Sequence, residues 1–417
     1  MKVLLVNKFH YKKGGSETYY FTLAGALQRN GHEVIFFSMK DEERNLPCSQ
    51  EEYFVSNASV KGGIKSKLNM VLHLAYSKEA YINMKRLLAE EKPDLVILNL
   101  VHKQITLSII DAIREYDRSL PVFWTMHDLI TVCPAYTMLD GKGNICEKCM
   151  GGSYRPCMAN KCIKGNALMS CLSVYEADYI RKRKWYDQVD LYICPSAFYK
   201  NKLEQAHFTS REICLLRNPL PGFEEQEINV RNEGYLLYFG RLCAEKGIKT
   251  LLDAVKRVGC RLLVLGTGPM EEELKEYARE MQNVEFKGFC QGKELEDYVR
   301  NSLCVVLPSE WYENGPYSAM EAMAMGKPLI VSDMGGLPEL VEEEKTGYIY
   351  EAGKGAGALE ECIRKLMRLS EDAYHDMACH AKEKAKEMFD QDQYVAQIEK
   401  YYEKITASCR KEKKRDA

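Results

Sequence analysis

The fold is decided by a segment that reads Leu303-Cys-Val-Val-Leu307-Pro308 and continues Ser309-Glu-Trp-Tyr-Glu313-Asn-Gly-Pro-Tyr-Ser-Ala-Met-Glu321. An apolar run that stops at a proline is typical of a buried strand, so we expect Glu313 in the loop at the strand's carboxyl end. Glu321 is expected on the helix that follows. Ligands bind at this edge of an open α/β sheet, and a carboxylate there can accept hydrogen bonds from both vicinal hydroxyls of a ribose or hexose. The segment therefore predicts an α/β fold with a sugar-nucleotide site.

A second loop with the same placement carries two cations. The strand-like run Tyr235 to Phe239 leads directly into Gly240-Arg241-Leu-Cys-Ala-Glu-Lys246-Gly247. Arginine offers a planar fork of donors and lysine a compact charge, so Arg241 and Lys246 can hold a diphosphate and neutralise it as it leaves. The alternative is a solvated basic turn that opens a helix.

Apolar runs of strand length recur along the chain and alternate with amphipathic segments. In the first half they are Lys2 to Val6, Val34 to Ser38, Leu95 to Leu98, Val122 to Met126, Leu191 to Cys194 and Ile213 to Leu216. In the second half they are Tyr235 to Phe239, Leu262 to Leu265, Val284 to Phe286, Leu303 to Leu307 and Leu329 to Val331. This alternation predicts two doubly wound, Rossmann-like domains. With 417 residues the chain suits two domains of about 200 residues each.

Two loops in the first half also follow strand-like runs. Gly14-Gly15 occupies the first strand-to-helix turn, where exposed amides and a helix N-terminus make an anion site, although a simple tight turn would also need glycine. His127 follows the run that ends at Met126, so we expect it at a strand's carboxyl end, where it can meet a sugar hydroxyl. A satisfied core histidine is the alternative. Asp128 can fix the tautomer of His127 or cap a turn.

Taken together, these segments resemble the retaining glycosyltransferases of family 4, which have the GT-B fold. The resemblance covers nearly the whole chain. Besides the two segments in the second half, it rests on Gly14-Gly15-Ser16-Glu17, His127-Asp128, Arg217-Asn218-Pro219 and Gly266-Thr-Gly268-Pro269. It implies an acceptor-side domain over residues 1–216 and a nucleotide-sugar-binding domain over residues 217–388, facing a central cleft. Residues 389–417 would form a helix, about Gln391 to Ile405, that returns to the first domain, and a basic tail.

The resemblance also implies roles for single residues. The catalytic residues would be His127, Arg241, Lys246 and Glu313. The donor would be bound by Gly14, Gly15, Gly240, Gly266, Asn314, Gly315, Pro316, Tyr317 and Glu321. Retention of anomeric configuration needs either a covalent double displacement or attack on the leaving group's own face. We favour same-face attack, in which Arg241 and Lys246 stabilise the diphosphate and Glu313 holds sugar hydroxyls. Glu321 would hold the ribose, and no catalytic metal is expected.

One departure from the family pattern lies at the donor site. The family commonly reads Glu-Gly-Phe-Gly where this chain has Glu313-Asn314-Gly315-Pro316. Backbone amides at Asn314, Gly315 and Tyr317 can still meet the donor sugar or its phosphate. The identity of the donor base and sugar therefore stays open.

Six cysteines lie close together in the first half, in a loop of about residues 128–171. They are Cys133, Cys146, Cys149, Cys157, Cys162 and Cys171. Cys146-x-x-Cys149 followed by Cys157-x4-Cys162 can supply four thiolates to a tetrahedral zinc, which would order a loop beside the active site. Free thiols in an acceptor-binding loop and an iron–sulfur cluster are the alternatives.

The net charge is −2, which argues against general nucleic-acid binding, but the charge is divided unevenly. Residues 1–215 hold 29 Lys and Arg against 23 Asp and Glu, a net +6, and the remainder holds 29 against 37, a net −8. The basic clusters of the first half are Lys61, Lys65, Lys67, Lys78, Lys85 and Arg86, and Arg181-Lys-Arg-Lys184. Such a surface can bind anionic lipid headgroups, with solvated helix faces as the alternative.

The sequence also indicates a compartment. No apolar stretch reaches the roughly 18 residues needed to span a bilayer, and Met1-Lys-Val-Leu-Leu-Val is too short for a signal peptide. We therefore expect a cytoplasmic protein, peripheral at the inner face of the membrane. Its 16 cysteines are then expected to be reduced thiols or metal ligands.

The resemblance implies transfer of a hexose from a nucleotide-diphosphate sugar to an oligosaccharide or lipid-linked acceptor, in the synthesis of a cell-surface polysaccharide or other glycan. A nucleotide-sugar epimerase is one alternative, and it would convert the donor without an acceptor. A metal or redox sensor on a disabled transferase scaffold is a second alternative. The intact Arg241, Lys246, Glu313 and Glu321 argue against that sensor.

Overall fold

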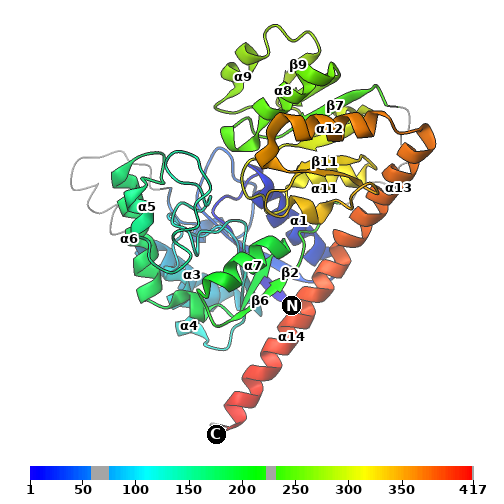
Figure 1. Ribbon diagram of the computed structural model, residues 1–417. Coiled ribbons are helices and arrows are strands. Elements are labelled where there is room, and N and C mark those ends of the chain that lie inside the picture. Colours follow the sequence, from blue (N-terminus) through cyan, green and yellow to red (C-terminus); the bar gives the residue numbers. More distant parts are fainter. Residues whose placement is uncertain (58–74, 222–231, 416–417) are drawn as a thin grey trace. The chain divides into compact units, whose positions relative to one another are not determined.

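The computed structural model describes residues 1–57, 75–221 and 232–415 of the chain. The chain divides into two compact units, Met1–Pro219 with Gln391–Ala417 and Leu220–Asp390. In the described part, each unit contains a six-stranded parallel sheet with helices connecting its strands (Figure 1). The prediction of an α/β protein with two Rossmann-like, doubly wound GT-B domains is confirmed.

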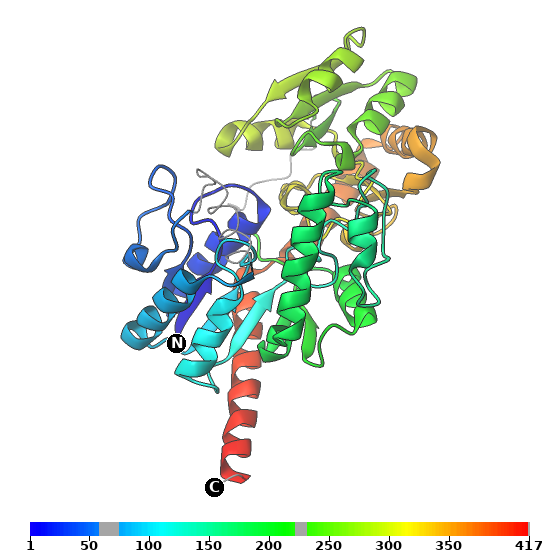
Figure 2. The same ribbon diagram turned by 90° about the vertical axis from the view of Figure 1, so that its left-hand side faces the viewer.

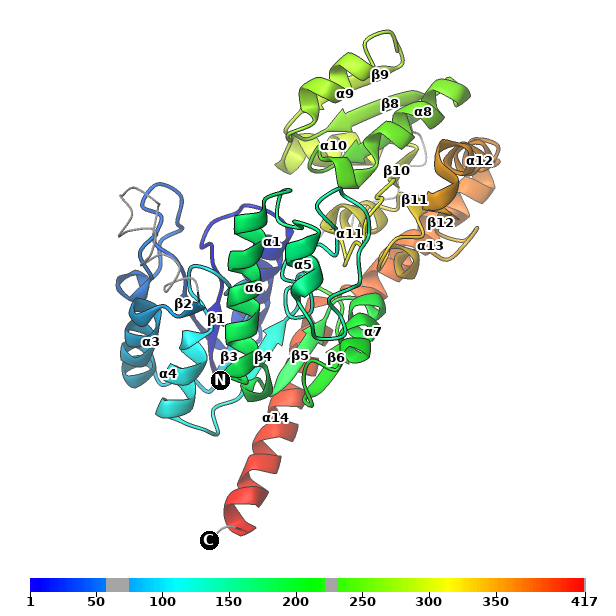
Figure 3. The same cartoon turned by 60° about the vertical axis from the view of Figure 1, so that its left-hand side comes forward.

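The sheet of the first unit has the strand order β2-β1-β3-β4-β5-β6 (Figure 3). Its strands are β1 (Lys2–Val6), β2 (Glu33–Phe37), β3 (Leu95–Leu98), β4 (Val122–Thr125), β5 (Leu191–Cys194) and β6 (Glu212–Leu215). β3, β4 and β5 are buried at every residue, as expected for parallel strands covered on both faces. The strand order reverses between β1 and β3, and open α/β sheets bind their ligands at the carboxyl ends of the strands beside such a switch point.

The helices of the first unit include the last helix of the chain. They are α1 (Gly15–Arg29), α3 (Lys78–Glu91), α4 (Ser108–Tyr116), α5 (Arg155–Ala159), α6 (Ala167–Lys182), α7 (Ala197–Ala206) and α14 (Gln391–Arg415), with 3-10 turns η1 (Glu51–Tyr53) and η2 (Trp185–Gln188). α3 and α4 lie side by side (Figures 2 and 3). α14 packs on α1, where the Tyr394 and Tyr19 hydroxyl oxygens are 2.7 Å apart. α14 is longer than predicted because its last residues are mostly Lys, Arg and Glu, which favour helix.

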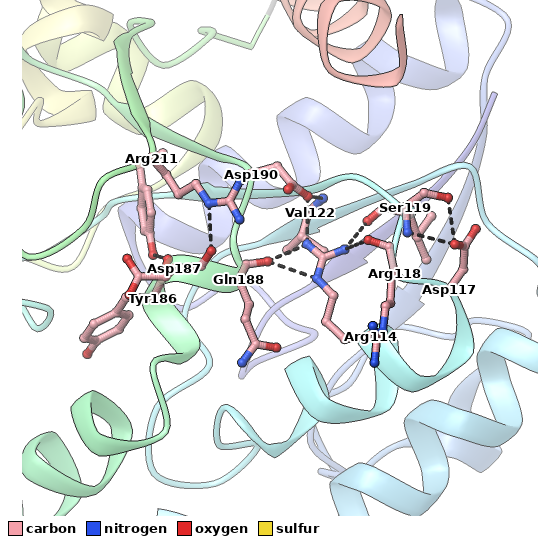
Figure 4. A network of polar contacts seen from close by, with 12 residues as sticks. Arg114, Asp117, Arg118, Ser119, Val122, Tyr186, Asp187, Gln188, Asp190 and Arg211 are labelled. Carbon is pink, nitrogen blue, oxygen red and sulfur yellow. Dashed lines mark hydrogen bonds and ion pairs between the residues drawn. The ribbon is translucent and has the colours of Figure 1, made fainter. Parts of the chain in front are cut away.

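Arg114 forms hydrogen bonds to several segments at the amino-terminal edge of the first sheet (Figure 4). Its guanidinium donates to the carbonyl oxygens of Gln188, Arg118 and Leu120, and its Nη2 lies 2.7 Å from Asp190 Oδ2. Asp190, just before β5, also accepts from the Val122 amide at the start of β4. The five N–H groups of an arginine thus all have acceptors here, so this network joins α4 to two strands.

The sheet of the second unit has the order β12-β11-β10-β7-β8-β9. Its strands are β7 (Tyr235–Phe239), β8 (Arg261–Leu265), β9 (Val284–Gly288), β10 (Cys304–Leu307), β11 (Leu329–Ser332) and β12 (Gly347–Tyr350). Read from β9, this is the Rossmann order 3-2-1-4-5-6, with its switch point between β7 and β10. β12 was not predicted, because a short run that begins with glycine after a charged stretch gives a weak strand signal.

The helices of the second unit connect these strands and enclose the apolar core. They are α8 (Ile248–Val258), α9 (Glu271–Tyr277), α10 (Gly292–Asn301), α11 (Tyr317–Ala324), α12 (Gly355–Met367) and α13 (Glu371–Met388), with 3-10 turns η3 (Ala244–Lys246), η4 (Leu337–Leu340) and η5 (Ala352–Lys354). The amphipathic helices α8 and α12 pack against each other. Their buried Leu251, Leu252 and Ile363 share a core with β7 and β8.

Candidate active site

Glycines hold the loops of the second unit together at the switch point. Gly247, at the end of the β7 loop, has φ +65°, and a Cβ atom there would lie 1.9 Å from the carbonyl oxygen of Pro308 after β10. A Cβ atom on Gly266, after β8, would lie 1.9 Å from the carbonyl oxygen of Gly240. No side chain fits at either distance, so glycine is needed for this close approach of backbones. The loops after β7, β8 and β10 therefore form one packed edge.

This packing brings Lys246 and Glu313 together. Lys246 Nζ lies 2.5 Å from Glu313 Oε1, which also accepts a 2.5 Å hydrogen bond from the Ser309 hydroxyl. The Lys246 ammonium also lies 5.5 Å from the ring centroid of Trp311. Burial alone would raise the pKa of Glu313, but the charge and hydrogen bond of Lys246 and the bond from Ser309 outweigh it and lower that pKa. Glu313 is therefore an ionised, oriented carboxylate that is 5% exposed.

A glycine of the next loop fixes the backbone of Glu313. Gly335, after β11, has φ +66°, and a Cβ atom there would lie 2.2 Å from the Glu313 carbonyl oxygen. That oxygen accepts a 2.7 Å hydrogen bond from the Gly336 amide. The loop after β11 thus fixes the backbone of the predicted catalytic residue, a role that the sequence did not reveal.

Arg241 and Glu321 differ from this pair because neither side chain has an ionic partner among the described residues. The Arg241 side chain is exposed, and its carbonyl oxygen accepts hydrogen bonds from the Tyr238 hydroxyl and the Cys243 thiol. Glu321, on α11, is half-buried, and burial followed by the charge of Glu296 raises its pKa to about 7. A cation and a carboxyl group that lack ionic partners in the described ranges and lie on the same edge suit a charged, hydroxyl-rich ligand.

The remaining predicted donor-binding residues of this unit lie at the start of α11. Asn314, Gly315 and Pro316 are half-buried, and Pro316 is the residue that precedes the first turn of the helix. Tyr317, the first helical residue, is 8% exposed. Amides at a helix start favour anions, which is consistent with the predicted contact to a phosphate or donor sugar.

In the first unit, His127 lies at the carboxyl end of β4, as predicted. Its Nε2 is 3.0 Å from Asn99 Oδ1, and the Asn99 Nδ2 donates to the Val6 carbonyl oxygen, which assigns Oδ1 as an acceptor. His127 Nε2 therefore carries the proton, and Nδ1 is left as an acceptor. Burial lowers the pKa of His127 to about 3, so the ring is neutral at physiological pH. Tyr19 packs edge-on against the ring at 4.9 Å between centroids.

Asp128 and the glycine pair complete the predicted site of the first unit. Asp128 Oδ1 accepts from the Ile130 amide, so Asp128 caps a turn and Asn99 sets the tautomer of His127. Gly14 is the N-cap of α1 and Gly15 its first residue, so the pair lies at a helix N-terminus as expected. The sequence interpretation missed Asn99, which gave no motif signal.

A family model described as Glycosyltransferase Family 4 matches residues 13–221, half of the chain. The chain belongs to glycosyltransferase family 4. A second model, described as Glycosyl transferases group 1, matches residues 223–387 of this glycosyltransferase. The two matched regions contain every residue predicted for the site.

Curated relatives of this glycosyltransferase share parts of its sequence. The uncharacterized glycosyltransferase MJ1607 of Methanocaldococcus jannaschii is 34% identical over 141 residues, which are 30% of the chain and 36% of the relative. The sulfoquinovosyl transferase SQD2 of Arabidopsis thaliana is 29% identical over 200 residues, 44% of the chain and 38% of the relative. The chain thus spans less than half the length of these two relatives.

Solved structures with the same fold cover nearly all of this glycosyltransferase. A sucrose-phosphate synthase from Thermosynechococcus elongatus has a TM-score of 0.67 at 18% identity, over 98% of the chain and 99% of that structure. Anabaena Alr3699/HepE in complex with UDP and glucose has a TM-score of 0.64 at 17% identity, over 96% of the chain and 98% of that structure. At these identities the likeness shows the fold.

Most thiols of the cysteine loop in this glycosyltransferase lie close to one another. Cys149 and Cys157 share a small apolar cluster with Tyr154, against which Cys162 packs. Burial raises the pKa of the Cys133 thiol to about 11 and that of Cys149 to about 12. In the described ranges, no three His, Cys, Asp or Glu side chains are placed to hold a metal ion. The zinc expected at Cys146, Cys149, Cys157 and Cys162 therefore stays a prediction.

The predicted site residues fall into two groups. One group, in the second unit, contains Gly240, Arg241, Lys246, Gly266, Glu313, Asn314, Gly315, Pro316, Tyr317 and Glu321. The other group, in the first unit, contains Gly14, Gly15 and His127. Each group gathers at the carboxyl ends of parallel strands, the edge at which α/β enzymes bind ligands.

Proposed function

We propose that this glycosyltransferase is a retaining enzyme that moves a hexose from a nucleotide-diphosphate sugar to an oligosaccharide or lipid-linked acceptor, in the synthesis of a cell-surface polysaccharide or other glycan. The observation that best supports this proposal is the 2.5 Å contact between Lys246 and Glu313 at the switch point of the second sheet. Arg241 and Glu321, which have no ionic partner among the described residues, belong to the same edge. Cations suit a diphosphate, and carboxylates suit the hydroxyls of a sugar and a ribose.

In the proposed mechanism, the acceptor hydroxyl attacks on the face from which the diphosphate leaves, and the diphosphate accepts its proton. Arg241 and Lys246 stabilise the charge that develops on the leaving diphosphate. Glu313 orients Lys246 and accepts hydrogen bonds from hydroxyls of the transferred sugar, while Glu321 binds the ribose. His127, which is neutral, accepts a hydrogen bond from a sugar hydroxyl at Nδ1 and does not act as a nucleophile.

Donor binding is the first test, because a ligand that binds only the folded state raises the apparent stability. Thermal unfolding is measured with UDP, GDP, ADP and their hexose conjugates. We expect a rise in Tm with one nucleotide family, and loss of that rise in Arg241→Ala. If no nucleotide raises the Tm of the wild-type protein, the donor site assigned here is wrong.

Product analysis tests the reaction itself. With a labelled donor and a panel of oligosaccharide and lipid-linked acceptors, NMR of the new glycosidic bond reports its anomeric configuration. Retention is expected, and inversion would contradict the proposed class. Conversion of the donor to an epimer with no acceptor present would favour the epimerase alternative.

We also propose that the enzyme works in the cytoplasm, peripherally at the inner face of the membrane. No helix in the described ranges is long and apolar enough to cross a bilayer. Lys182 and Lys184 are exposed, whereas Lys85 and Arg86 pair with Glu115 and Glu52. Lys61, Lys65 and Lys67 lie outside the described residues. Co-sedimentation with vesicles rich in phosphatidylserine, reduced in a Lys182→Gln, Lys184→Gln double variant, is the expected result; equal binding to neutral vesicles would contradict it.

A further inference from the structure

Two lysines stand at the switch point of the first sheet. β1 and β3 are paired neighbours, with Val6 opposite Leu98, and the strand order reverses between them. Lys8 comes just after β1, and Lys103 lies in the loop after β3. The Asn99 amide donates to the Val6 carbonyl oxygen, which holds the two strand ends together. Both lysines therefore rise from the edge at which an open α/β sheet binds its ligand, and none of the roles assigned above uses them.

The loop that presents Lys103 is held in an unusual conformation. Lys103 has φ 75° and Thr106 has φ 64°, both in the left-handed region that non-glycine residues rarely adopt. The Lys103 amide donates to Glu176 Oε1 at 3.1 Å, and the Thr106 amide donates to the Val101 carbonyl oxygen at 2.7 Å. Left-handed backbone at non-glycine residues is strained, and such strain tends to cluster at binding and active sites.

The two ammonium groups are compensated only in part by nearby carboxyl groups: the charges of Glu176 and Glu17 act to raise the pKa of Lys8, and that of Lys103 acts to lower the pKa of Asp128. Lys8 Nζ lies 5.0 Å from the ring centroid of Phe9, and Lys103 Nζ lies 5.6 Å from that of Tyr136. Neither lysine forms an ion pair within the described residues. Burial, followed by the charge of Lys103, lowers the pKa of Lys8 to about 8. Burial also raises the pKa of the neighbouring Glu176 to about 7, so this carboxyl group is only partly ionised at neutral pH.

Two polar atoms of the same loop are also without partners. His102 Nε2 and Gln104 Oε1 are buried and make no hydrogen bond within the described part of the chain. The pKa of His102 is lowered to about 3 by burial and then by the charges of Lys103 and Lys8, so its ring is neutral. Buried polar atoms nearly always have partners, so a ligand or water is expected beside them.

We propose that the acceptor carries an anionic group, a carboxylate or a phosphate, which binds between Lys8 and Lys103. This inference rests on the proposed function and adds the chemical class of the acceptor. The anion supplies the negative charge that the two lysines lack, and the neutral His102 and Gln104 are donors or acceptors for the hydroxyls around it. An acidic sugar and a sugar or lipid phosphate share this chemistry.

Ligand-observed NMR with three probes tests the inference on the whole 417-residue chain. The probes are glucuronate, glucose 6-phosphate and methyl glucoside, at constant ionic strength. We expect at least one anionic probe to bind saturably and at least tenfold more tightly than methyl glucoside. The preferred anion distinguishes a carboxylate acceptor from a phosphate acceptor. Equal binding of charged and neutral probes, or no binding of any, would overturn the inference.

Matched variants assign the binding to these lysines. Lys8→Gln and Lys103→Gln are expected to weaken binding of the anion at least tenfold, whereas Lys8→Arg restores most of it. Lys293→Gln, an exposed lysine of α10 in the other unit, is the control and is expected to change nothing. Unchanged anion binding in both glutamine variants contradicts the inference.

The nucleotide-induced rise in Tm is measured on the same variants. If it persists while no probe binds, the acceptor inference fails and the proposed function stands. If a probe binds while no nucleotide does, the donor assignment fails instead. If Lys8→Gln and Lys103→Gln abolish the nucleotide effect, the lysines serve the donor diphosphate and the inference is wrong.

Discussion

The two edges of the first sheet handle positive charge in opposite ways. At the amino-terminal edge, Arg114 has an acceptor for each of its donors and pairs with Asp190 at 2.7 Å (Figure 4). At the carboxyl-terminal edge, Lys8 and Lys103 lie near each other with no ion pair in the described part of the chain. The charge at the amino edge is matched within the protein, whereas the proposed anion would complete the matching of charge at the carboxyl edge. Satisfied charges support a fold, and unmatched charges indicate a binding site.

The carboxyl edge of the second sheet is intermediate between these two edges in how far its positive charge is paired within the protein. Lys246 is paired with Glu313, but its side chain is still 22% exposed. A lysine has three donors, so this ammonium can hold Glu313 and still reach a diphosphate. The structural pairing and the proposed catalytic role are therefore compatible at one residue.

The largest expected effect is on catalysis at Lys246. Lys246→Ala should lower kcat by about 10²–10³, because a preorganised charge on the leaving diphosphate is lost. Steady-state rates of transfer measure this. Lys249→Ala, a nearby exposed lysine that pairs with Glu273, is the control and should keep a normal rate. Near-normal turnover of Lys246→Ala would place this residue with Arg114 among the purely structural cations.

Loss of Arg114 should affect stability and leave the donor site intact. Arg114→Met should lower the free energy of unfolding by about 3 kcal/mol, because Asp190 and several carbonyl oxygens lose a partly buried partner. Urea unfolding measures this change. Arg118→Met, at an exposed side chain just after α4, should stay within about 0.5 kcal/mol of the wild type. A donor-binding defect in Arg114→Met would contradict the division between the two edges.

Glu321 should make donor binding depend on pH. Its pKa of about 7 lies above the value near 4.5 for an unfolded chain, so the folded protein holds the proton more tightly. The resulting stabilisation is present below pH 4.5 and is lost as the pH rises through about 7. Ribose hydroxyls bind the ionised form, so nucleotide affinity should rise about tenfold between pH 6 and pH 8. Calorimetric titration measures this rise.

Two variants sharpen this pH test. Glu321→Gln should remove the pH dependence of nucleotide affinity. Glu296→Gln should move its midpoint to lower pH, because the charge of Glu296 is the second cause of the raised pKa. A pH profile that is unchanged in Glu321→Gln would show that another group titrates.

The smallest expected effect on turnover belongs to the cysteine loop. If the predicted zinc is present, protein purified without chelator should contain about one equivalent, and Cys149→Ser should lose it. Cys171→Ser, at an exposed thiol outside the predicted ligand set, is the control. Elemental analysis measures zinc and iron together. Zinc well below one equivalent, with no iron, would leave a loop of free thiols.

The sequence predicted most of the fold because strands covered on both faces are unbroken apolar runs. β12 was not predicted, since Gly347-Tyr-Ile-Tyr350 is short and follows charged residues. The positions of His127, Lys246 and Glu313 after strands were predictable for the same reason. The contact between Lys246 and Glu313 was not, because it joins residues 67 positions apart.

That contact depends on backbone approaches that no single motif describes. Gly247 against Pro308 and Gly335 against Glu313 bring the loops within reach of each other. Asn99 was missed for a related reason, because its role comes from the pairing of β3 with β1. Sequence patterns locate side chains along elements, whereas the partners of those side chains come from packing.

The bond between Tyr19 and Tyr394 has a consequence for synthesis of the protein. These residues are 375 positions apart, and Tyr19 also bonds Thr125 and packs against His127. A ribosome adds about 5–20 residues per second, so Tyr394 is synthesised roughly 20–75 s after Tyr19. During that time the first unit lacks α14, although the six strands of its described sheet have all been made. The nascent chain must therefore keep this surface from aggregating until α14 has left the ribosome.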